Sequence, residues 1–199
     1  MKINQLANNS MMLFILSCAC LCYSCKGKSS LGNAKEGKPE VIGIGKILML
    51  PDSMEVYRPF PNYLLDSGKI NQSTLKIYTF INVSCSTCLE DIEKWSRLNS
   101  KLRKYNVPIV VICESKDKFE VFKYFCEQGT IKKFPYPFFL DLKNEYVKKN
   151  PFVFTHAGFK TLLTNQENKI LLAGDPIHFE SKEKEYLSVL SKYSGSLKK

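Results

Sequence analysis

The fold of this chain is decided by the stretch Leu75-Lys-Ile-Tyr-Thr-Phe-Ile-Asn-Val-Ser-Cys-Ser-Thr-Cys88. Its first nine residues are rich in β-branched and aromatic side chains, which predicts a buried central strand that ends at the two cysteines. After Cys88, apolar residues recur at three- and four-residue steps from Leu89 to Tyr105, with charged residues between them. This spacing predicts an amphipathic helix of about four turns directly after the cysteine pair.

The rest of the chain continues this alternation of strand and helix. On the amino side, an opening hairpin or edge strand is expected at residues 41–50. After the motif helix, the residue pattern predicts a strand at 107–113, a helix at 118–128 and a short strand at 136–140. It then predicts a weak helix at 144–149, a hairpin of 160–164 with 169–173, and a closing helix at 183–193. Strands that alternate with helices imply parallel pairs with right-handed crossovers. The predicted class is therefore α/β, with a central mixed β-sheet flanked by helices and an amino-terminal hairpin or edge extension.

The amino terminus has the pattern of an export signal. Lys2 opens a short polar stretch, and residues 11–22 supply an apolar run that is too short to span a bilayer as a mature helix. Small residues precede Cys18 and Cys25, and both sites resemble the lipobox at which bacterial lipoproteins are cleaved and acylated. Cys25 is favoured as the lipid anchor, because the apolar run ends there and the polar stretch 26–38 begins. Cys18 is the alternative.

These features predict a lipoprotein signal peptide at 1–24, a flexible tether at 25–40 and one domain at 41–199. An uncleaved anchor and an ordinary secretory signal stay open as alternatives. In each case the domain is exported to a compartment where disulfides persist. We expect a cell-envelope protein that is held on a membrane by its lipid and faces the periplasm or the cell exterior.

Composition and charge exclude several classes of protein. Hydrophobic residues make up 44% of the 199 residues and charged residues 24%, which argues against wholesale disorder and against a multi-span membrane protein. The formal charge is +10, but five of the 29 basic residues lie in the leader and tether. The 24 basic and 17 acidic residues that remain carry a net charge of +7, spread along helices rather than gathered in one stripe. A nucleic-acid partner is therefore not expected.

The order of elements around the Cys-x-x-Cys motif resembles the thioredoxin-like fold over residues 75–193. More narrowly, the chain is similar to the membrane-anchored thiol–disulfide oxidoreductases (TlpA-like) of bacterial envelopes. This resemblance implies that Cys85 is the nucleophile and Cys88 the resolving cysteine, that the partners are exported proteins with thiols or disulfides, and that no dissociable cofactor is needed. A cysteine at a helix amino terminus is expected to have a pKa between about 3.5 and 7.5 instead of about 8.5.

The chain also departs from the family pattern. Thioredoxins carry a cis-proline before the third core strand, whereas Phe159, preceded by Gly158, stands there in this sequence. A cis peptide before a residue other than proline costs about 2.5 to 4 kcal/mol, so we expect a trans peptide and a differently shaped substrate-docking loop. Thr79 stands near the place of the buried acid that assists proton transfer, and Ser84 replaces the usual tryptophan.

Three alternatives to an exchange enzyme stay open. Cys85 and Cys88 would form a static disulfide or half of a metal site in a purely structural role, although no second Cys-x-x-Cys in the folded part supplies the other zinc ligands. The missing proline favours a non-catalytic binding lipoprotein on the same scaffold. A peroxiredoxin-type peroxidase ranks last. For Cys113 and Cys126 the expectation is two buried structural thiols, with a mutual disulfide as the alternative.

Overall fold

The structure is a computed structural model, and it describes residues 43–155 and 159–196. Six strands form one mixed sheet in the order β1-β4-β3-β2-β5-β6. The strands are β1 (Glu55–Tyr57), β2 (Leu75–Asn82), β3 (Ile109–Glu114), β4 (Phe138–Leu140), β5 (Thr161–Asn165) and β6 (Ile170–Ala173). The helices are α1 (Ser67–Gln72), α2 (Ser86–Leu102), α3 (Glu120–Glu127), α4 (Glu145–Lys149) and α5 (Glu180–Ser196), with short 3-10 helices at Arg103–Tyr105 and Pro151–Phe154.

Strand β2 lies inside the sheet, as its unbroken apolar run predicted. It runs parallel to β3 and antiparallel to β5, and seven of its eight residues are buried. β3 is parallel to β4, whereas β1 and β6 are antiparallel to their neighbours. Parallel strands with both faces covered are typical of α/β proteins. The predicted α/β class with a mixed, helix-flanked sheet is confirmed.

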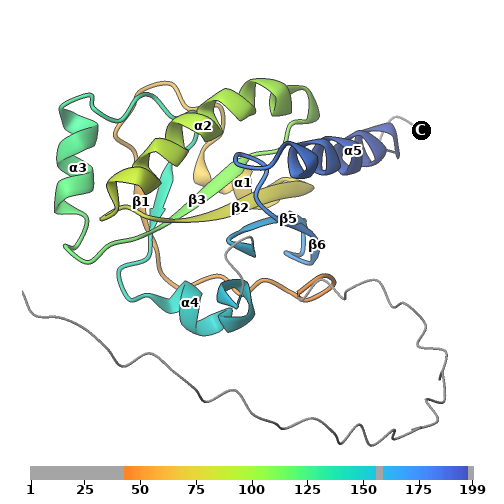
Figure 1. Cartoon of the computed structure of the whole chain (residues 1–199), viewed down its shortest axis with the longest axis horizontal. Helices are drawn as coiled ribbons and strands as arrows, with labels where there is room; N and C mark the ends of the chain where they lie inside the picture. Colours follow the sequence, from red (N-terminus) through yellow and green to blue (C-terminus); the bar gives the residue numbers. More distant parts are fainter. Residues whose placement is uncertain (1–42, 156–158, 197–199) are drawn as a thin grey trace, which may run out of the picture. The chain divides into compact units, whose positions relative to one another are not determined.

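Helices cover both faces of the sheet. Figure 1 shows α2 and α5 on one face and α4 on the opposite face. On the first face the side chain of Trp95, from α2, is completely buried. On the second face Tyr146, from α4, stacks on Phe80 of β2 with ring centroids 5.8 Å apart. The central strands are therefore shielded from water on both sides, and the end of β2 is held rigidly where α2 begins.

The segment before β1 forms an edge rather than a hairpin. Gly43 and Gly45 have φ angles of 107° and 82°, so the chain turns there and cannot form a regular strand. Ile47 makes a single antiparallel bridge with Lys169, just before β6. The described part of this segment, residues 43–50, is therefore an extension along the sheet edge, and it forms neither the predicted hairpin nor a regular edge strand.

Two short elements, β1 and α1, have no counterpart in the sequence prediction. The other helices and strands agree with it to within a few residues at their ends. Among residues 43–155 and 159–196, no helix is both long and apolar enough to cross a bilayer. The predicted signal peptide, the tether, both candidate anchor cysteines and Gly158 lie outside the described residues, so those expectations stay predictions.

Candidate active site

Cys85 lies at the junction between the central strand and the long helix. Val83 still donates its N–H to the carbonyl of Glu114 at 2.9 Å, so the strand pairing continues to the edge of the motif. Cys85 then takes an extended conformation (φ −110°, ψ 118°) and forms the N-cap of α2. Its carbonyl accepts the N–H of Leu89 at 3.2 Å, which starts the helix. The sulfur is thus held at the amino end of a helix, on a half-buried residue.

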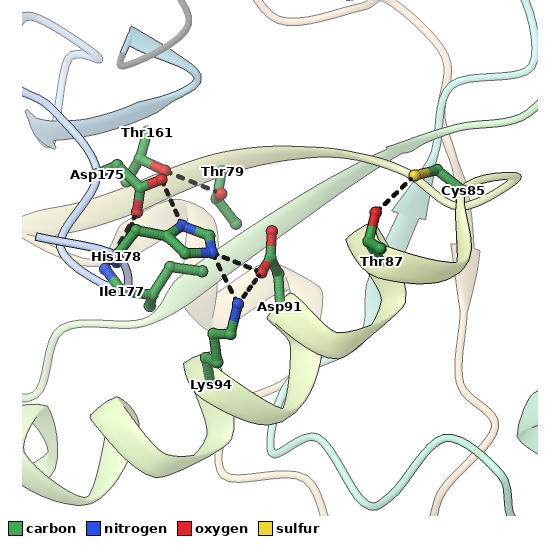
Figure 2. A network of polar contacts seen from close by, with 9 residues as sticks. All are labelled: Thr79, Cys85, Thr87, Asp91, Lys94, Thr161, Asp175, Ile177 and His178. Atoms are coloured by element: carbon green, nitrogen blue, oxygen red, sulfur yellow. Dashed lines mark hydrogen bonds and ion pairs between the residues drawn. The ribbon is translucent and has the colours of Figure 1, made fainter.

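The electrostatics of this position favour a thiolate. The first amide groups of a helix have no partner within it, and the macrodipole adds partial positive charge at that end. Helix α2 is 17 residues long and has no acidic residue in its first turn to compete for those amides. The hydroxyl of Thr87 lies 3.1 Å from Cys85 Sγ (Figure 2). A hydroxyl at this distance can donate to a sulfur anion, so Thr87 adds a further stabilising contact.

The second cysteine of the motif belongs to the first turn of the same helix. Cys88 comes three residues after Cys85 and lies within α2. Its side chain is outside the described part of the structure. The resolving role of Cys88 therefore stays a prediction, supported by the helical spacing that stacks positions three apart.

Ser84 is part of a polar brace that ties the motif to the loop after β3. Its hydroxyl lies 3.2 Å from that of Ser115 and accepts the N–H of Lys116 at 2.9 Å. Ser115 in turn donates to Asp117, whose carboxylate accepts the N–H of Val121 at 3.0 Å. The hydrogen bond from Ser115, followed by that from Val121, lowers the pKa of Asp117. The residue that replaces tryptophan thus contributes hydrogen bonds that fix the loop before Cys85.

Phe159 lies two residues before the first residue of β5, at the position where the resemblance places a proline. Thr161 pairs with Thr79, and the carbonyl of Lys160 accepts the N–H of Phe80 at 3.0 Å. The Phe159 side chain is half-buried and packs against the core. Because residues 156–158 lie outside the described part, the docking role of Gly158 and Phe159 stays a prediction.

Thr79 is a buried neutral residue of the central strand β2. Its hydroxyl lies 3.0 Å from that of Thr161, and both residues face the side of the sheet that α2 covers (Figure 2). The first carboxylates beside this pair belong to Asp91 of α2 and Asp175 of the loop after β6, which line the same small cavity. The structure therefore places an acid near the motif, but it comes from the helix and not from the strand.

A charged cluster that was not predicted from the sequence surrounds that acid. His178 Nε2 lies 3.0 Å from Asp91 Oδ1, and His178 Nδ1 lies 2.7 Å from Asp175 Oδ2. Lys94 Nζ is 2.9 Å from Asp91 Oδ1 and 2.7 Å from His178 Nε2. Two local signals were present in the sequence: Asp91 three residues after Cys88, and His178 three residues after Asp175. Only the fold brings the two pairs together.

The remaining described cysteines lie apart from this chemistry. Cys113 in β3 and Cys126 in α3 are buried and are free thiols, as predicted, and the alternative of a mutual disulfide is not formed. Burial raises the pKa of Cys113 well above its usual value and that of Cys126 to about 12. Within residues 43–155 and 159–196, no group of three or more His, Cys, Asp or Glu side chains is arranged to hold a metal ion.

These environments predict a large difference in thiol reactivity. At pH 7, Cys85 should react with iodoacetamide at least about tenfold faster than Cys88, Cys113 or Cys126, because only a thiolate is a good nucleophile. The measurement is pulsed alkylation of the reduced protein, with each cysteine quantified by peptide mass spectrometry. The urea-unfolded protein is the control, in which the four rates should converge. Equal rates for Cys85 and Cys126 in the folded protein would contradict the assignment.

Comparison with known proteins adds information on the fold. No protein-family model and no curated protein sequence matches the chain. Among solved structures, it is similar to a Chlorobium tepidum protein described as thiol:disulfide interchange protein DsbE, with 12% identity, 75% of this chain and 99% of that chain covered, and a TM-score of 0.51.

Two further similar structures have lower TM-scores. A Bacteroides thetaiotaomicron protein described as a protein disulfide isomerase has 16% identity and a TM-score of 0.49, over 80% of this chain and 92% of that one. StoA from Bacillus subtilis has 17% identity and a TM-score of 0.40, over 51% and 73%. The fold conclusion rests on the Chlorobium match alone, and at that identity it concerns the fold only. This chain has the thioredoxin-like fold, with a mixed six-stranded sheet flanked by helices.

Proposed function

We propose that this protein is a thiol–disulfide oxidoreductase of the cell envelope that acts on cysteines of exported proteins. The observation that carries the proposal is the position of Cys85, half-buried at the amino terminus of a 17-residue helix directly after a buried strand. That position stabilises a thiolate where a partner can reach it. The similar Chlorobium tepidum structure is described by the same chemistry and supports the proposal at the level of the fold.

The proposed reaction has two exchange steps. The Cys85 thiolate attacks a partner disulfide, which forms a Cys85–partner bond and releases one partner sulfur as a thiolate. Cys88 loses its proton and attacks Cys85, which forms the Cys85–Cys88 disulfide and releases the second partner sulfur. The partner gains the two electrons that the motif loses, and its two thiolates take up the proton from Cys88 and the proton that Cys85 had given to solvent. The same steps in reverse oxidise a partner dithiol.

The place of action is part of the proposal. A lipid on Cys25, followed by the polar stretch 26–40, would hold the domain near a membrane surface while leaving it free to meet exported proteins. No dissociable cofactor takes part, because the electrons come from the two sulfur atoms. The anchor is tested by measuring where the protein is located in the cell, so this test is independent of the exchange reaction.

Covalent trapping tests the exchange reaction. With Cys88→Ser, the first mixed disulfide has no resolving thiol, so complexes with envelope proteins should accumulate at least about tenfold above the wild-type level. The measurement is acid quenching of cells, followed by non-reducing electrophoresis and identification of the partners. The matched control is the double variant Cys85→Ser, Cys88→Ser, which should trap nothing.

The opposite outcome would favour the second candidate, a non-catalytic binding protein. The observation in its favour is Phe159, a bulky residue packed against the core where a proline would present backbone to a substrate. Equal complexes from the single and double variants, or none from Cys88→Ser under oxidising conditions, would contradict exchange and support binding alone.

A further inference from the structure

Three large apolar side chains are exposed in the first residues that the structure describes. Ile44, Ile47 and Met49 are 44%, 49% and 52% exposed. The other exposed large apolar residues of the described part are spread along the chain from Leu64 to Tyr193, and single apolar residues on a surface are ordinary. Ile44, Ile47 and Met49 lie within six consecutive residues and form an edge patch, which has no role in the proposed exchange chemistry.

A turn at the start of this segment carries the first of the three side chains. The Lys46 N–H donates to the carbonyl of Gly43 at 3.1 Å, and Gly45 has a φ of 82°. A positive φ at the third residue is what a type II turn requires. Ile44 therefore lies at the tip of a turn, where polar residues and glycine are usual and a large apolar side chain gains no burial.

The next residues alternate between the two sides of the sheet edge. Leu48 is buried, with 1% exposure, so its neighbours Ile47 and Met49 point outward. Asn150 is itself fully buried and fixes the backbone here, since its side-chain amide bonds to the N–H and the carbonyl of Met49 at 2.9 and 2.7 Å. The edge patch is thus part of the folded backbone and needs no ordering before it meets a partner.

Two exposed lysines flank the edge patch. Lys169 lies opposite Ile47 in an antiparallel bridge, and opposed residues place their side chains on the same face. Lys46 lies in the patch segment itself. Residues 43–51 and 169–174 contain these two lysines and no aspartate or glutamate, and neither lysine forms an ion pair with a residue that the structure describes. Exposed apolar side chains beside ammonium groups fit a surface that is apolar inside and anionic at its boundary, as a bilayer of acidic phospholipids is.

The segment that leads to the predicted anchor joins the domain at this patch. Residues 26–42 separate Cys25 from Gly43, which is the first described residue and the neighbour of Ile44. A flexible chain of that length spans about 20–25 Å on average. A patch on so short a tether meets the membrane at an effective concentration in the millimolar range, so a contact that is too weak to hold the protein by itself is still formed.

We propose that the edge patch contacts the surface of an anionic phospholipid bilayer and orients the lipid-anchored domain on it. The inference rests on the lipid anchor of the proposed function and is independent of the exchange reaction. The three apolar side chains enter the boundary between headgroups and acyl chains, while Lys46 and Lys169 pair with lipid phosphates. The docked domain then keeps one orientation instead of tumbling on its tether.

Quenching by labelled lipid tests this contact. Full-length, acylated protein carrying Ile47→Trp is added to vesicles of phosphatidylglycerol and phosphatidylcholine, prepared with and without brominated acyl chains. After the wild-type signal of buried Trp95 is subtracted, bromine should lower the emission from position 47 by at least about twofold, because bromine quenches only within contact range of the acyl region. Tyr124→Trp is the matched control at a residue that is 57% exposed on α3, and its emission should change by less than about 1.2-fold.

The two lysines give a second measurement on the same protein. The double change Lys46→Gln, Lys169→Gln should reduce the quenching at position 47 by about twofold or more, and raised salt should have the same effect, because both weaken the attraction to lipid phosphates. The charge-matched control is Lys104→Gln, Lys133→Gln, which alters exposed lysines on other elements and should leave the quenching unchanged.

Each outcome decides for or against the contact. If Ile47→Trp disturbs the fold, Met49→Trp provides the same measurement from the other outward position. Absence of quenching at both positions, or equal quenching at position 124, in protein that floats with the vesicles overturns the inference and leaves the anchor standing. Failure to float removes the anchor, and the inference falls with it. A dimer of the Cys25→Ala protein that Ile47→Asp dissociates in sedimentation would mean that a second copy covers the patch, which also overturns the inference.

Discussion

Replacing Phe138 with alanine is expected to lower the free energy of unfolding by about 3–5 kcal/mol. Phe138 is completely buried in β4. Its ring contacts those of Phe122, Phe134 and Phe60, with centroids 5.1, 5.3 and 6.3 Å away. Loss of the ring removes these contacts and leaves a cavity that rigid neighbours cannot fill. Urea unfolding followed by circular dichroism and by Trp95 fluorescence measures the change.

Tyr124→Ala is the control for this prediction. Tyr124 is 57% exposed on α3 and has one tilted ring contact, with Phe125 at 6.0 Å. Its removal should change the free energy of unfolding by less than about 1 kcal/mol. A loss below about 1.5 kcal/mol for Phe138→Ala would show that the aromatic cluster around β4 repacks, contrary to the rigid core described above.

Replacing Cys25 with alanine is expected to move the protein from the membrane fraction to the soluble fraction almost completely. Each buried methylene of an acyl chain contributes about 0.8 kcal/mol to membrane binding, so two or more chains give stable attachment. Without the acylated cysteine, the polar stretch 26–38 offers only charge to hold the protein at a surface. Fractionation and incorporation of a labelled fatty acid measure the effect.

Cys18→Ala is the matched control and should leave attachment and labelling unchanged. It removes a cysteine within the apolar run, where an anchor would leave residues 19–22 stranded beyond the lipid. Undiminished labelling after Cys25→Ala would contradict the site assignment. Loss of labelling with Cys18→Ala alone would transfer it to the alternative cysteine.

The centre of the fold was predictable because its signals are local. The run that ends at Val83 has no polar alternation, which fits a strand covered on both faces, and the helix after it shows a clear three- and four-residue period. Two short apolar segments separated by Asn165-Gln-Glu-Asn168 likewise predicted the β5–β6 hairpin. In each case the residues that define the element lie next to one another in the sequence.

The elements that escaped prediction depend on distant partners. β1 has only three residues, and it is held as a strand by its pairing with β4, where Val56 lies opposite Phe139. α1 is six residues long and has one buried side chain, Ile70, which is too little for a periodic pattern. Short elements of this kind are stabilised by tertiary contacts and have weak propensities of their own.

The candidate site likewise contains features set by neighbouring residues, which were predictable, and features set by distant contacts, which were not. Cys85 was predictable because its chemistry follows from a strand, a cysteine and a helix in direct succession. The contact of Asp91 with His178 joins residues 87 positions apart and depends on how the loop after β6 meets α2. The strand that holds Thr79 was predictable, but its hydrogen-bond partner Thr161 is defined only by the register between β2 and β5.

One stretch of chain, residues 45–57, meets both edges of the sheet (Figure 1). At one edge Gly45 and Lys46 bond to the backbone of Ile170, each at 2.8 Å, and at the other edge β1 pairs with β4. Between them, Asn150 holds Met49 through two hydrogen bonds of 2.9 and 2.7 Å. Uncovered edge strands are templates for pairing between molecules. This stretch therefore covers part of the β6 edge and leaves only the three-residue strand β1 at the other edge, and short or covered edges offer little template for such pairing.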